Sequence, residues 1–169
     1  VIIFCFYLNT NQINNIKTKY FYIMKLPING LIHIFNKNFY MIETRMEQMS
    51  YILQHDIVNY KKYKKFSKKG YKRNVVYRNH LFEISVLCWQ PGQQSTKHTH
   101  PKNGCLMKVL EGSLVEERYI LDKVQKNIYK ENDVTFIRGD QEHSIKNNSK
   151  TKHLVTLHIY SPPNYYSKL

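Results

Sequence analysis

Cysteine is scarce in this sequence: Cys5, Cys88 and Cys105 are the only three in 169 residues. Three cysteines are too few for the disulfide framework of a small secreted domain. Apolar runs are also short, since the longest, residues 1–8, stops well before the about 18 to 20 residues that a membrane-spanning helix needs. That run lacks the basic residues and the small-residue cleavage site of a signal peptide. The sequence therefore predicts a cytoplasmic protein with reduced thiols and no membrane span.

Acidic residues are few: 12 Asp and Glu oppose 26 Lys and Arg, which gives a formal net charge of +14. Hydrophobic residues nevertheless make up 42% of the chain and aromatic residues 14%, which argues against a wholly disordered protein. At this length, such a content is enough for one domain with a buried core. The positive charge makes a polyanionic partner such as RNA a function to consider.

Much of the excess charge lies in residues 57–80, which contain no acid and nine bases. The bases are Lys61, Lys62, Lys64, Lys65, Lys68, Lys69, Lys72, Arg73 and Arg78. An RNA-binding surface would place these bases on phosphates and stack nucleobases on Tyr60, Tyr63 and Phe66. The simpler interpretation is a solvated basic face. The whole chain is rich in Lys, Asn, Ile and Tyr, as an AT-biased genome would encode, so we favour the solvated face and keep nucleic-acid binding as the alternative.

Three segments are expected along the chain. Residues 1–23 are expected to be a non-native or disordered leader, with Met24 as the true start. Residues 24–70 form an N-terminal helical and basic segment, in which four apolar residues recur at helical spacing and predict an amphipathic helix within residues 43–56. The four are Met46, Met49, Ile52 and Leu53. The Lys-rich residues 56–70 are expected to be a connection, and residues 71–169 the main domain.

From residue 71 onward the sequence consists of short segments with period-two alternation. Phe82, Ile84, Val86 and Cys88 fall on one face of an expected strand, and Glu83 lies on the other face. Further strands are expected within residues 105–109, 114–121, 134–138, 143–146 and 154–160, with turn residues between them. The pattern predicts a mainly β protein, an antiparallel jelly-roll barrel. The interior of such a barrel is a common place for a metal site.

His98 and His100 are the first candidates for metal binding. They lie two residues apart, so on an extended segment both imidazoles point to the same side and can reach one ion. Their spacing from Cys105 and Gly112, followed later by His143, resembles the paired motifs of the cupin superfamily. Cupins normally have a Glu where this chain has Cys105, so the resemblance leaves three histidines as the ligand set.

Polar side chains alternate near the end of the chain, where Thr156, His158 and Tyr160 share one face of the last expected strand. Residues 157–163, Leu-His-Ile-Tyr-Ser-Pro-Pro, resemble the cysteine dioxygenase family. Other matching segments occur in the family's order and approximate spacing, so that the resemblance spans residues 71–163. These segments are Tyr71-Lys72-Arg73-Asn74, Leu87-Cys88-Trp89, Pro91-Gly92, His98-Thr99-His100, Cys105, residues 109–112, and His143 with Asn147.

The resemblance implies roles for individual residues. His98, His100 and His143 would bind Fe(II), and Arg73, supported by Tyr71, would bind the substrate carboxylate. Arg78 is a competing candidate for the carboxylate, but the Tyr-x-Arg-Asn pattern fits Arg73, and a guanidinium fork suits a carboxylate.

The family also implies a thioether crosslink between Cys105 and Tyr160. The link would hold the phenol beside the iron, and His158 would hydrogen-bond with Thr156 and Tyr160 and so position it. Tyr160, His158 and Cys105 are therefore the expected catalytic residues.

The predicted function is Fe(II)- and O2-dependent oxidation of L-cysteine to cysteine sulfinate by a monomer. One alternative keeps the chemistry and changes the substrate to 3-mercaptopropionate or another small thiol, although Arg73 favours a substrate with a carboxylate. An alternative of another class is a non-catalytic cupin that binds RNA through its basic segment or binds only a metal. The donor set does not single out iron, since three histidines also accept Zn, Ni or Cu.

Overall fold

Strand β10 (Leu154–Tyr160) lies at the centre of the structure, between β4 (Glu83–Trp89) and β5 (Cys105–Glu111). The computed structural model describes residues 24–38, 40 and 45–163, so the predicted leader at residues 1–23 lies outside the described residues. All residues of β4 and β10 are buried, which is expected of strands covered on both faces. Within the described part of the chain, no helix is long and apolar enough to cross a membrane.

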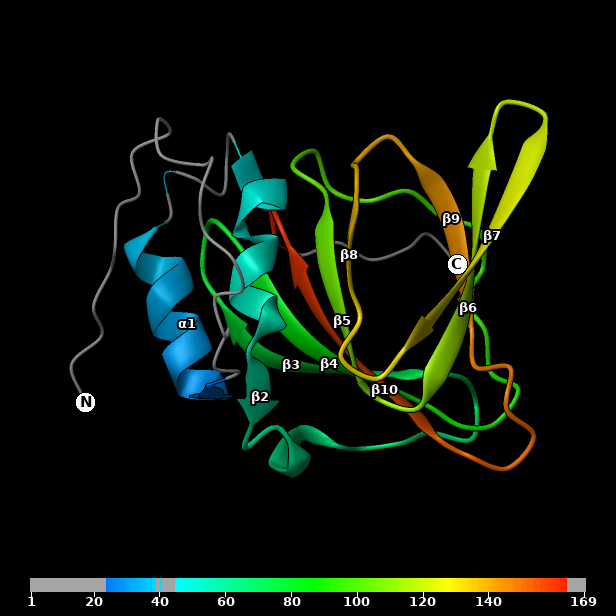
Figure 1. The fold of residues 1–169 in the computed structure, drawn as a ribbon, viewed down its shortest axis with the longest axis horizontal. Coiled ribbons are helices and arrows are strands. Elements are labelled where there is room, and N and C mark those ends of the chain that lie inside the picture. The colour runs from blue at the N-terminus through cyan, green and yellow to red at the C-terminus, as the bar shows by residue number, and fades with distance from the viewer. Residues whose placement is uncertain (1–23, 39, 41–44, 164–169) are drawn as a thin grey trace, which may run out of the picture.

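Two antiparallel sheets make up most of the molecule. The larger has the order β3-β4-β10-β5-β8, where β3 is Lys72–Arg78 and β8 is Val134–Ile137. The smaller has the order β7-β6-β9, with β7 at Lys123–Lys130, β6 at Ser113–Ile120 and β9 at Glu142–Lys146. Figure 1 shows the smaller sheet on one side of the larger and the helices on the other. The mainly β, antiparallel architecture expected from the alternation is confirmed.

One hydrophobic core lies between the two sheets. Trp89 and Met107 of the larger sheet pack in it with Leu114 and Ile145 of the smaller. The same face of the larger sheet also carries the polar residues that matter below. Tyr160 lies opposite Glu83 and His158 opposite Ser85 in the β10–β4 pairing, and directly opposite residues share a face. The interior between the sheets is therefore apolar towards the Trp89 end of β4 and polar towards the Glu83 end.

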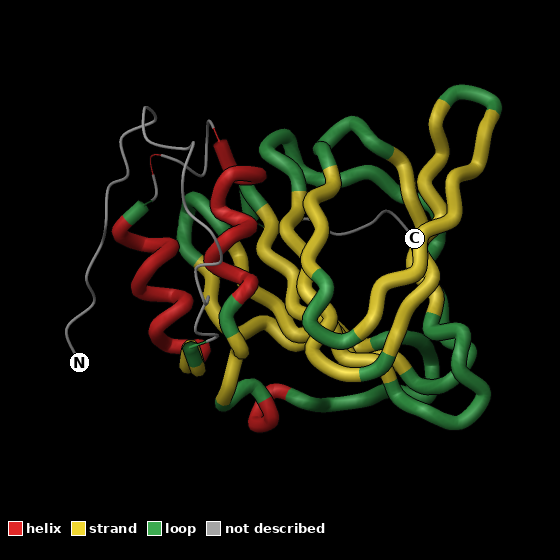
Figure 2. Tube along the Cα trace, viewed as in Figure 1, coloured by secondary structure: helices red, strands yellow, loops and turns green. Residues whose placement is uncertain are grey.

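A second core covers the outer face of the larger sheet. Ile84 and Leu157 of the sheet pack there with Leu31 of α1 (Ile28–Lys37) and Leu53 of the 3-10 helix η1 (Met46–Gln54). Figure 2 shows both helices on the side of the molecule away from the smaller sheet. The fully buried Lys108 of β5 ties these layers together, since its Nζ donates a hydrogen bond of 2.8 Å to the Leu53 carbonyl at the end of η1. The N-terminal elements therefore support the sheet from behind.

Some N-terminal elements differ from the sequence-based expectation. The four apolar residues of the expected helix are all buried, but they belong to a 3-10 helix, and residues 43–44 lie outside the described residues. The expected connection at residues 56–70 contains β2 (Asp56–Val58), which pairs in parallel with β1 (Lys25–Pro27), and a short 3-10 turn, η2 (Lys61–Tyr63). The elements α1, β3 and β7 were not predicted from the sequence. β7 is mostly exposed on both faces, so its sequence lacks the apolar alternation by which a strand is found.

Candidate metal and substrate site

The structure brings together the three histidines singled out in the sequence. His98 and His100 lie in the loop 90–104 between β4 and β5, and His143 lies in β9. Two backbone hydrogen bonds of 2.9 Å join His98 and His143, and the His100 amide donates to the Gly139 carbonyl at 3.0 Å. One ligand atom from each ring lies within 4.8 Å of the other two. The loop is thus held against β9 by main-chain bonds that set the three imidazoles around one point.

The chemistry of these rings fits a divalent transition metal. The Nδ1 of His98 lies 2.8 Å from the Thr96 carbonyl, so this nitrogen carries the proton and Nε2 carries the lone pair. The Nε2 of His143 is buried without a hydrogen-bond partner. Burial and the neighbouring His143 lower the pKa of His98 to about 4, and the same causes lower the pKa of His100 further. The two rings are therefore neutral at pH 7, which is the form that binds metal.

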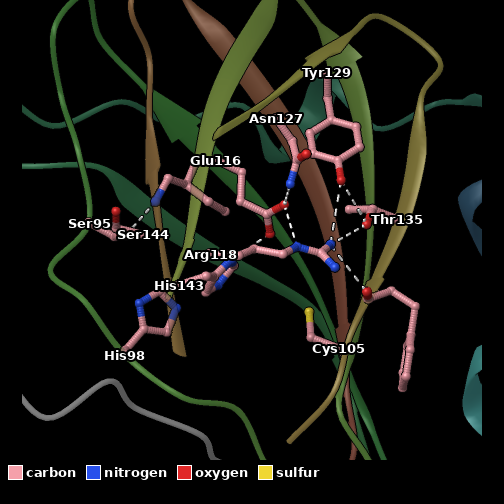
Figure 3. Close-up of polar contacts among 12 residues, drawn as sticks. Ser95, His98, Cys105, Glu116, Arg118, Asn127, Tyr129, Thr135, His143 and Ser144 are labelled. Atoms are coloured by element: carbon pink, nitrogen blue, oxygen red, sulfur yellow. Dashed lines mark hydrogen bonds and ion pairs between the residues drawn. The ribbon is translucent and has the colours of Figure 1, made fainter. Parts of the chain in front are cut away.

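Glu116 supports His143 from behind (Figure 3). Its Oε1 lies 2.7 Å from His143 Nδ1, both side chains are fully buried, and Arg118 Nε donates to Oε2 at 2.8 Å. Burial by itself would raise the pKa of Glu116, but the hydrogen bonds from His143 and Arg118 outweigh it and lower the pKa. Arg118 is held in turn by Thr135 Oγ1 at 2.7 Å. A carboxylate that accepts a hydrogen bond from Nδ1–H leaves the lone pair on Nε2 and so orients this nitrogen of a ligand histidine towards the metal.

Sequence reasoning missed Glu116 and Arg118. Their positions in the strand could have indicated them. Leu114, Glu116 and Arg118 share one face of β6, and the buried Leu114 shows that this face points inward. An acid and a base at inward positions of a strand indicate a buried ion pair.

A chain of hydrogen bonds leads from Trp89 to Tyr160. Trp89 Nε1 can only donate, so Thr156 Oγ1 accepts from it at 3.1 Å. His158 Nε2 is a second partner of this hydroxyl, at 2.9 Å, and with the indole donating we assign the hydroxyl proton to a bond donated to Nε2. Burial lowers the pKa of His158 well below its usual value, so the ring is neutral. With Nε2 accepting from Thr156, the single ring proton lies on Nδ1. Nδ1 lies 3.0 Å from Tyr160 Oη and 3.6 Å from the Cys105 sulfur. The phenol oxygen of Tyr160 therefore accepts a hydrogen bond from His158.

Cys105 and Tyr160 lie directly opposite each other in the β5–β10 pairing. Side chains at such positions are neighbours on one face of the sheet. Burial raises the pKa of both the Cys105 thiol and the Tyr160 phenol, so both groups are protonated at neutral pH.

Arg73 lies beside the same tyrosine, with its guanidinium carbon 4.2 Å from the centre of the Tyr160 ring. Its Nε donates to Glu83 Oε1 at 2.9 Å, and Arg78 Nε donates to the other oxygen of Glu83 at 2.7 Å. The two candidates for the carboxylate partner thus share one internal carboxylate, which the sequence did not indicate. Tyr71, predicted to support Arg73, stacks on Trp89 with ring centres 4.2 Å apart.

The side chains proposed for RNA stacking make contacts within the protein. Tyr60 donates to Glu111 at 2.9 Å, and Phe66 packs on the His153 ring with centres 4.3 Å apart. Lys64 forms an ion pair of 2.7 Å with the same Glu111. These contacts do not favour a surface on which nucleobases stack.

Comparison with known proteins gives a consistent result. A family model described as Cysteine dioxygenase type I matches residues 25–168. The human protein named cysteine dioxygenase type 1 is 31% identical over 146 residues, which cover 79% of this chain and 73% of the human one. The protein of the same name from Bos taurus is 34% identical over 111 residues, which cover 60% of this chain and 56% of that one.

Solved structures support the fold. A protein with a double-stranded β-helix domain from Klebsiella pneumoniae superposes with a TM-score of 0.55 at 22% identity, covering 64% of this chain and 85% of that one. A protein from Thermus thermophilus has the same TM-score at 17% identity, covering 63% and 97%. The expected mainly β, cupin-type fold is confirmed. Among the described residues the strands form two separate antiparallel sheets, so the predicted barrel is not closed by strand pairing.

Proposed function

The chain belongs to the cysteine dioxygenase type I family, and from this premise we propose that it oxidises the sulfur of L-cysteine with O2 to cysteine sulfinate. The observation that carries the proposal is the group of three histidines beside Tyr160 and Arg73. His98, His100 and His143 would hold Fe(II), which when bound supplies coordination positions for the substrate thiolate and for O2. Glu116 would keep the His143 ring in the orientation and tautomer that binding requires.

Arg73 is the proposed partner of the substrate carboxylate. A guanidinium presents several N–H donors in one plane, and a carboxylate accepts two of them side by side. Stacking on the Tyr160 ring and the bond to Glu83 limit the orientations that this guanidinium can take. Because a fixed cation binds a carboxylate at one place, it also sets where the substrate sulfur lies.

Tyr160 is the proposed proton donor at the reacting sulfur and oxygen atoms. Its oxygen accepts the His158 Nδ1 proton, so its own O–H proton is turned away from His158. Burial keeps the phenol protonated at neutral pH because it raises the phenol pKa. The Tyr160 hydroxyl can therefore stabilise negative charge that develops on oxygen.

The position of Cys105 opposite Tyr160 supports the proposal of a thioether crosslink. Forming the C–S bond removes the thiol hydrogen and one ring hydrogen, and O2, already a substrate, takes up these two protons and two electrons to give H2O2. The link would remove the remaining freedom of the Tyr160 ring and fix the hydroxyl in place. Intact-mass measurement would detect the loss of two hydrogens.

The test is anaerobic loading with Fe(II), followed by O2 uptake and mass analysis of products from L-cysteine and 3-mercaptopropionate in parallel. We expect one cysteine sulfinate for each O2 consumed. Preference for 3-mercaptopropionate would keep the chemistry and change the substrate. If a folded, iron-loaded protein consumed no O2 with either thiol, the proposed activity would be wrong. We keep three further predictions from the sequence: a cytoplasmic location, a monomeric state and a separate N-terminal segment.

A further inference from the structure

Arg73, Glu83 and Arg78 form a charged cluster, here called the Arg–Glu–Arg cluster, at the edge of the larger sheet. Arg73 and Arg78 are five residues apart in β3, and side chains an odd number apart point to opposite faces of a regular strand. The pairing of β3 with β4 shifts register between Val75 and Tyr77. An extra residue of this kind reverses the alternation beyond it, so both arginines face the interior. Arg73 then lies opposite Leu87 and Arg78 opposite Glu83.

The carboxylate of the cluster is fully buried and is held by hydrogen bonds at both oxygens. Ser85 Oγ donates to Oε1 at 2.6 Å, next to Arg73 Nε, and Arg78 donates to Oε2. The side chains of Arg73 and Arg78 are 18% and 34% exposed, whereas Glu83 is 0% exposed. Two guanidinium groups and one carboxylate give the cluster a formal net charge of +1.

The cluster adjoins the proposed substrate position. Arg73 stacks on the ring of Tyr160, and that ring lies 6.1 Å from the ring of His100. A carboxylate held by Arg73 would therefore also experience the charges of Glu83 and Arg78. Glu83 is fully buried and repels such an anion strongly, whereas Arg78 is one third exposed and attracts the anion through partial solvent screening.

We propose that Glu83 and Arg78 determine how tightly this site binds a substrate carboxylate. Glu83 is a positioning residue that holds the Arg73 guanidinium against Tyr160. Arg78 offsets the charge of Glu83, so that the positive charge of Arg73 acts on the substrate. The inference rests on the proposed function, because it assumes that a carboxylate-bearing thiol binds beside Arg73. It predicts a preference for thiols that carry one carboxylate over thiols that carry none.

The experiment measures anaerobic binding of L-cysteine, 3-mercaptopropionate and cysteamine to the Fe(II)-loaded protein, together with kcat and KM for L-cysteine. Arg78→Gln lowers the net charge of the cluster to 0. We expect the Kd of the two carboxylate ligands, L-cysteine and 3-mercaptopropionate, to rise about tenfold. Glu83→Gln raises the net charge of the cluster to +2, so the same Kd values should fall. The Gln side chain keeps an oxygen that accepts a hydrogen bond from Arg73. The double variant returns to +1 and should bind both carboxylates within about threefold of the unaltered protein.

Cysteamine is the reference ligand because it has no carboxylate, and its Kd should change less than the Kd of the carboxylates in every variant. The matched control is Arg138→Gln, which removes an arginine from an exposed ion pair with Asp140 and should change no Kd. kcat for L-cysteine should change less than KM. Arg78→Lys keeps the charge and should leave the Kd of both carboxylates within about threefold of the unaltered protein. If Arg78→Gln does not fold, Glu83→Gln still changes the charge and tests the inference, and an unchanged Kd of L-cysteine in that variant would overturn it.

The inference would be overturned if Arg78→Gln and Glu83→Gln shifted the Kd of L-cysteine in the same direction, or if cysteamine shifted as much as the carboxylates. Either result would make the cluster a purely structural ion pair. If the unaltered protein bound no thiol at all, the proposed function would fail instead, so the two failures are distinguishable.

Discussion

At the scale of single residues, the chemistry of this site depends on buried groups that fix the protons of their neighbours. His143, Glu116 and Arg118 form one such set, and Trp89, Thr156 and His158 form the other. In each set, a group that can only donate or only accept decides which nitrogen of a histidine carries the proton. The two sets therefore settle the tautomers at the two places where the proposed reaction needs them.

Replacing Glu116 by Gln tests the first set. Gln keeps the shape of the side chain but removes the charge that pairs with His143 and Arg118. We expect metal affinity to fall by about 10- to 100-fold. Anaerobic Fe(II) titration measures this, and the unfolding midpoint of the metal-free protein reports separately on the fold. The control is Glu117→Gln at the adjacent position on β6, which should leave the affinity unchanged.

Replacing Thr156 by Val tests the second set. Valine cannot donate to His158 Nε2, so the ring loses the bond that places its proton on Nδ1, towards Tyr160. We expect kcat for L-cysteine to fall by about 10- to 100-fold with little change in KM, because the carboxylate partner is untouched. Thr156→Ser keeps the hydroxyl and should retain most of the activity. Equal activity of the Val and Ser variants would contradict the proton assignment.

At the scale of elements, the site depends on irregularities and on support from behind the sheet. The bulge in β3 places both arginines inside, and the loop 90–104 carries two of the three histidines. Behind the larger sheet, α1 and η1 bury the face that would otherwise be an exposed apolar surface. Because β4 and β10 are packed on both faces, their inward side chains have little freedom to move.

Replacing Leu53 by Ala tests the contribution of η1. Leu53 is fully buried against the outer face of the sheet, and its loss leaves a cavity. We expect the free energy of unfolding to fall by about 2 to 5 kcal/mol in urea denaturation. The neighbouring Tyr51 is 60% exposed, and Tyr51→Ala should change stability by less than about 0.5 kcal/mol. Similar effects of the two changes would show that η1 does not pack on the sheet as described.

At the scale of the whole molecule, the group of three histidines links stability to pH. The pKa of His98 is about 4 in the folded protein, because burial disfavours the charged ring, and about 6.5 in an unfolded chain. Between these values the unfolded chain binds a proton that the folded chain does not. Stability of the metal-free protein therefore falls as the pH falls from about 6.5 towards about 4.

Thermal unfolding of the metal-free protein at about pH 7.5 and about pH 5 checks this link. We expect a lower midpoint at the lower pH, and His98→Gln should reduce the difference, since Gln does not titrate. An unfolding midpoint that rose on acidification would contradict the assignment of the His98 ring as buried and neutral in the folded protein.

The mainly β class and the candidate residues could be predicted from the sequence alone, because alternation sets which side chains share a face and because motif spacing is local. The sequence indicated that Thr156, His158 and Tyr160 act together, and it placed His98 and His100 side by side. It missed β7, which is too exposed to show a pattern, and α1.

Which distant side chains meet could be learned only from the folded chain. The pairing of Glu116 with His143 joins β6 to β9, and the sharing of Glu83 by Arg73 and Arg78 requires a bulge that reverses the alternation of β3. Both depend on strand order and register, which follow from the packing of the whole chain and not from any local run of residues. The two arginine candidates could therefore be identified from the sequence, but their shared partner Glu83 could not, because it depends on the register of β3 against β4.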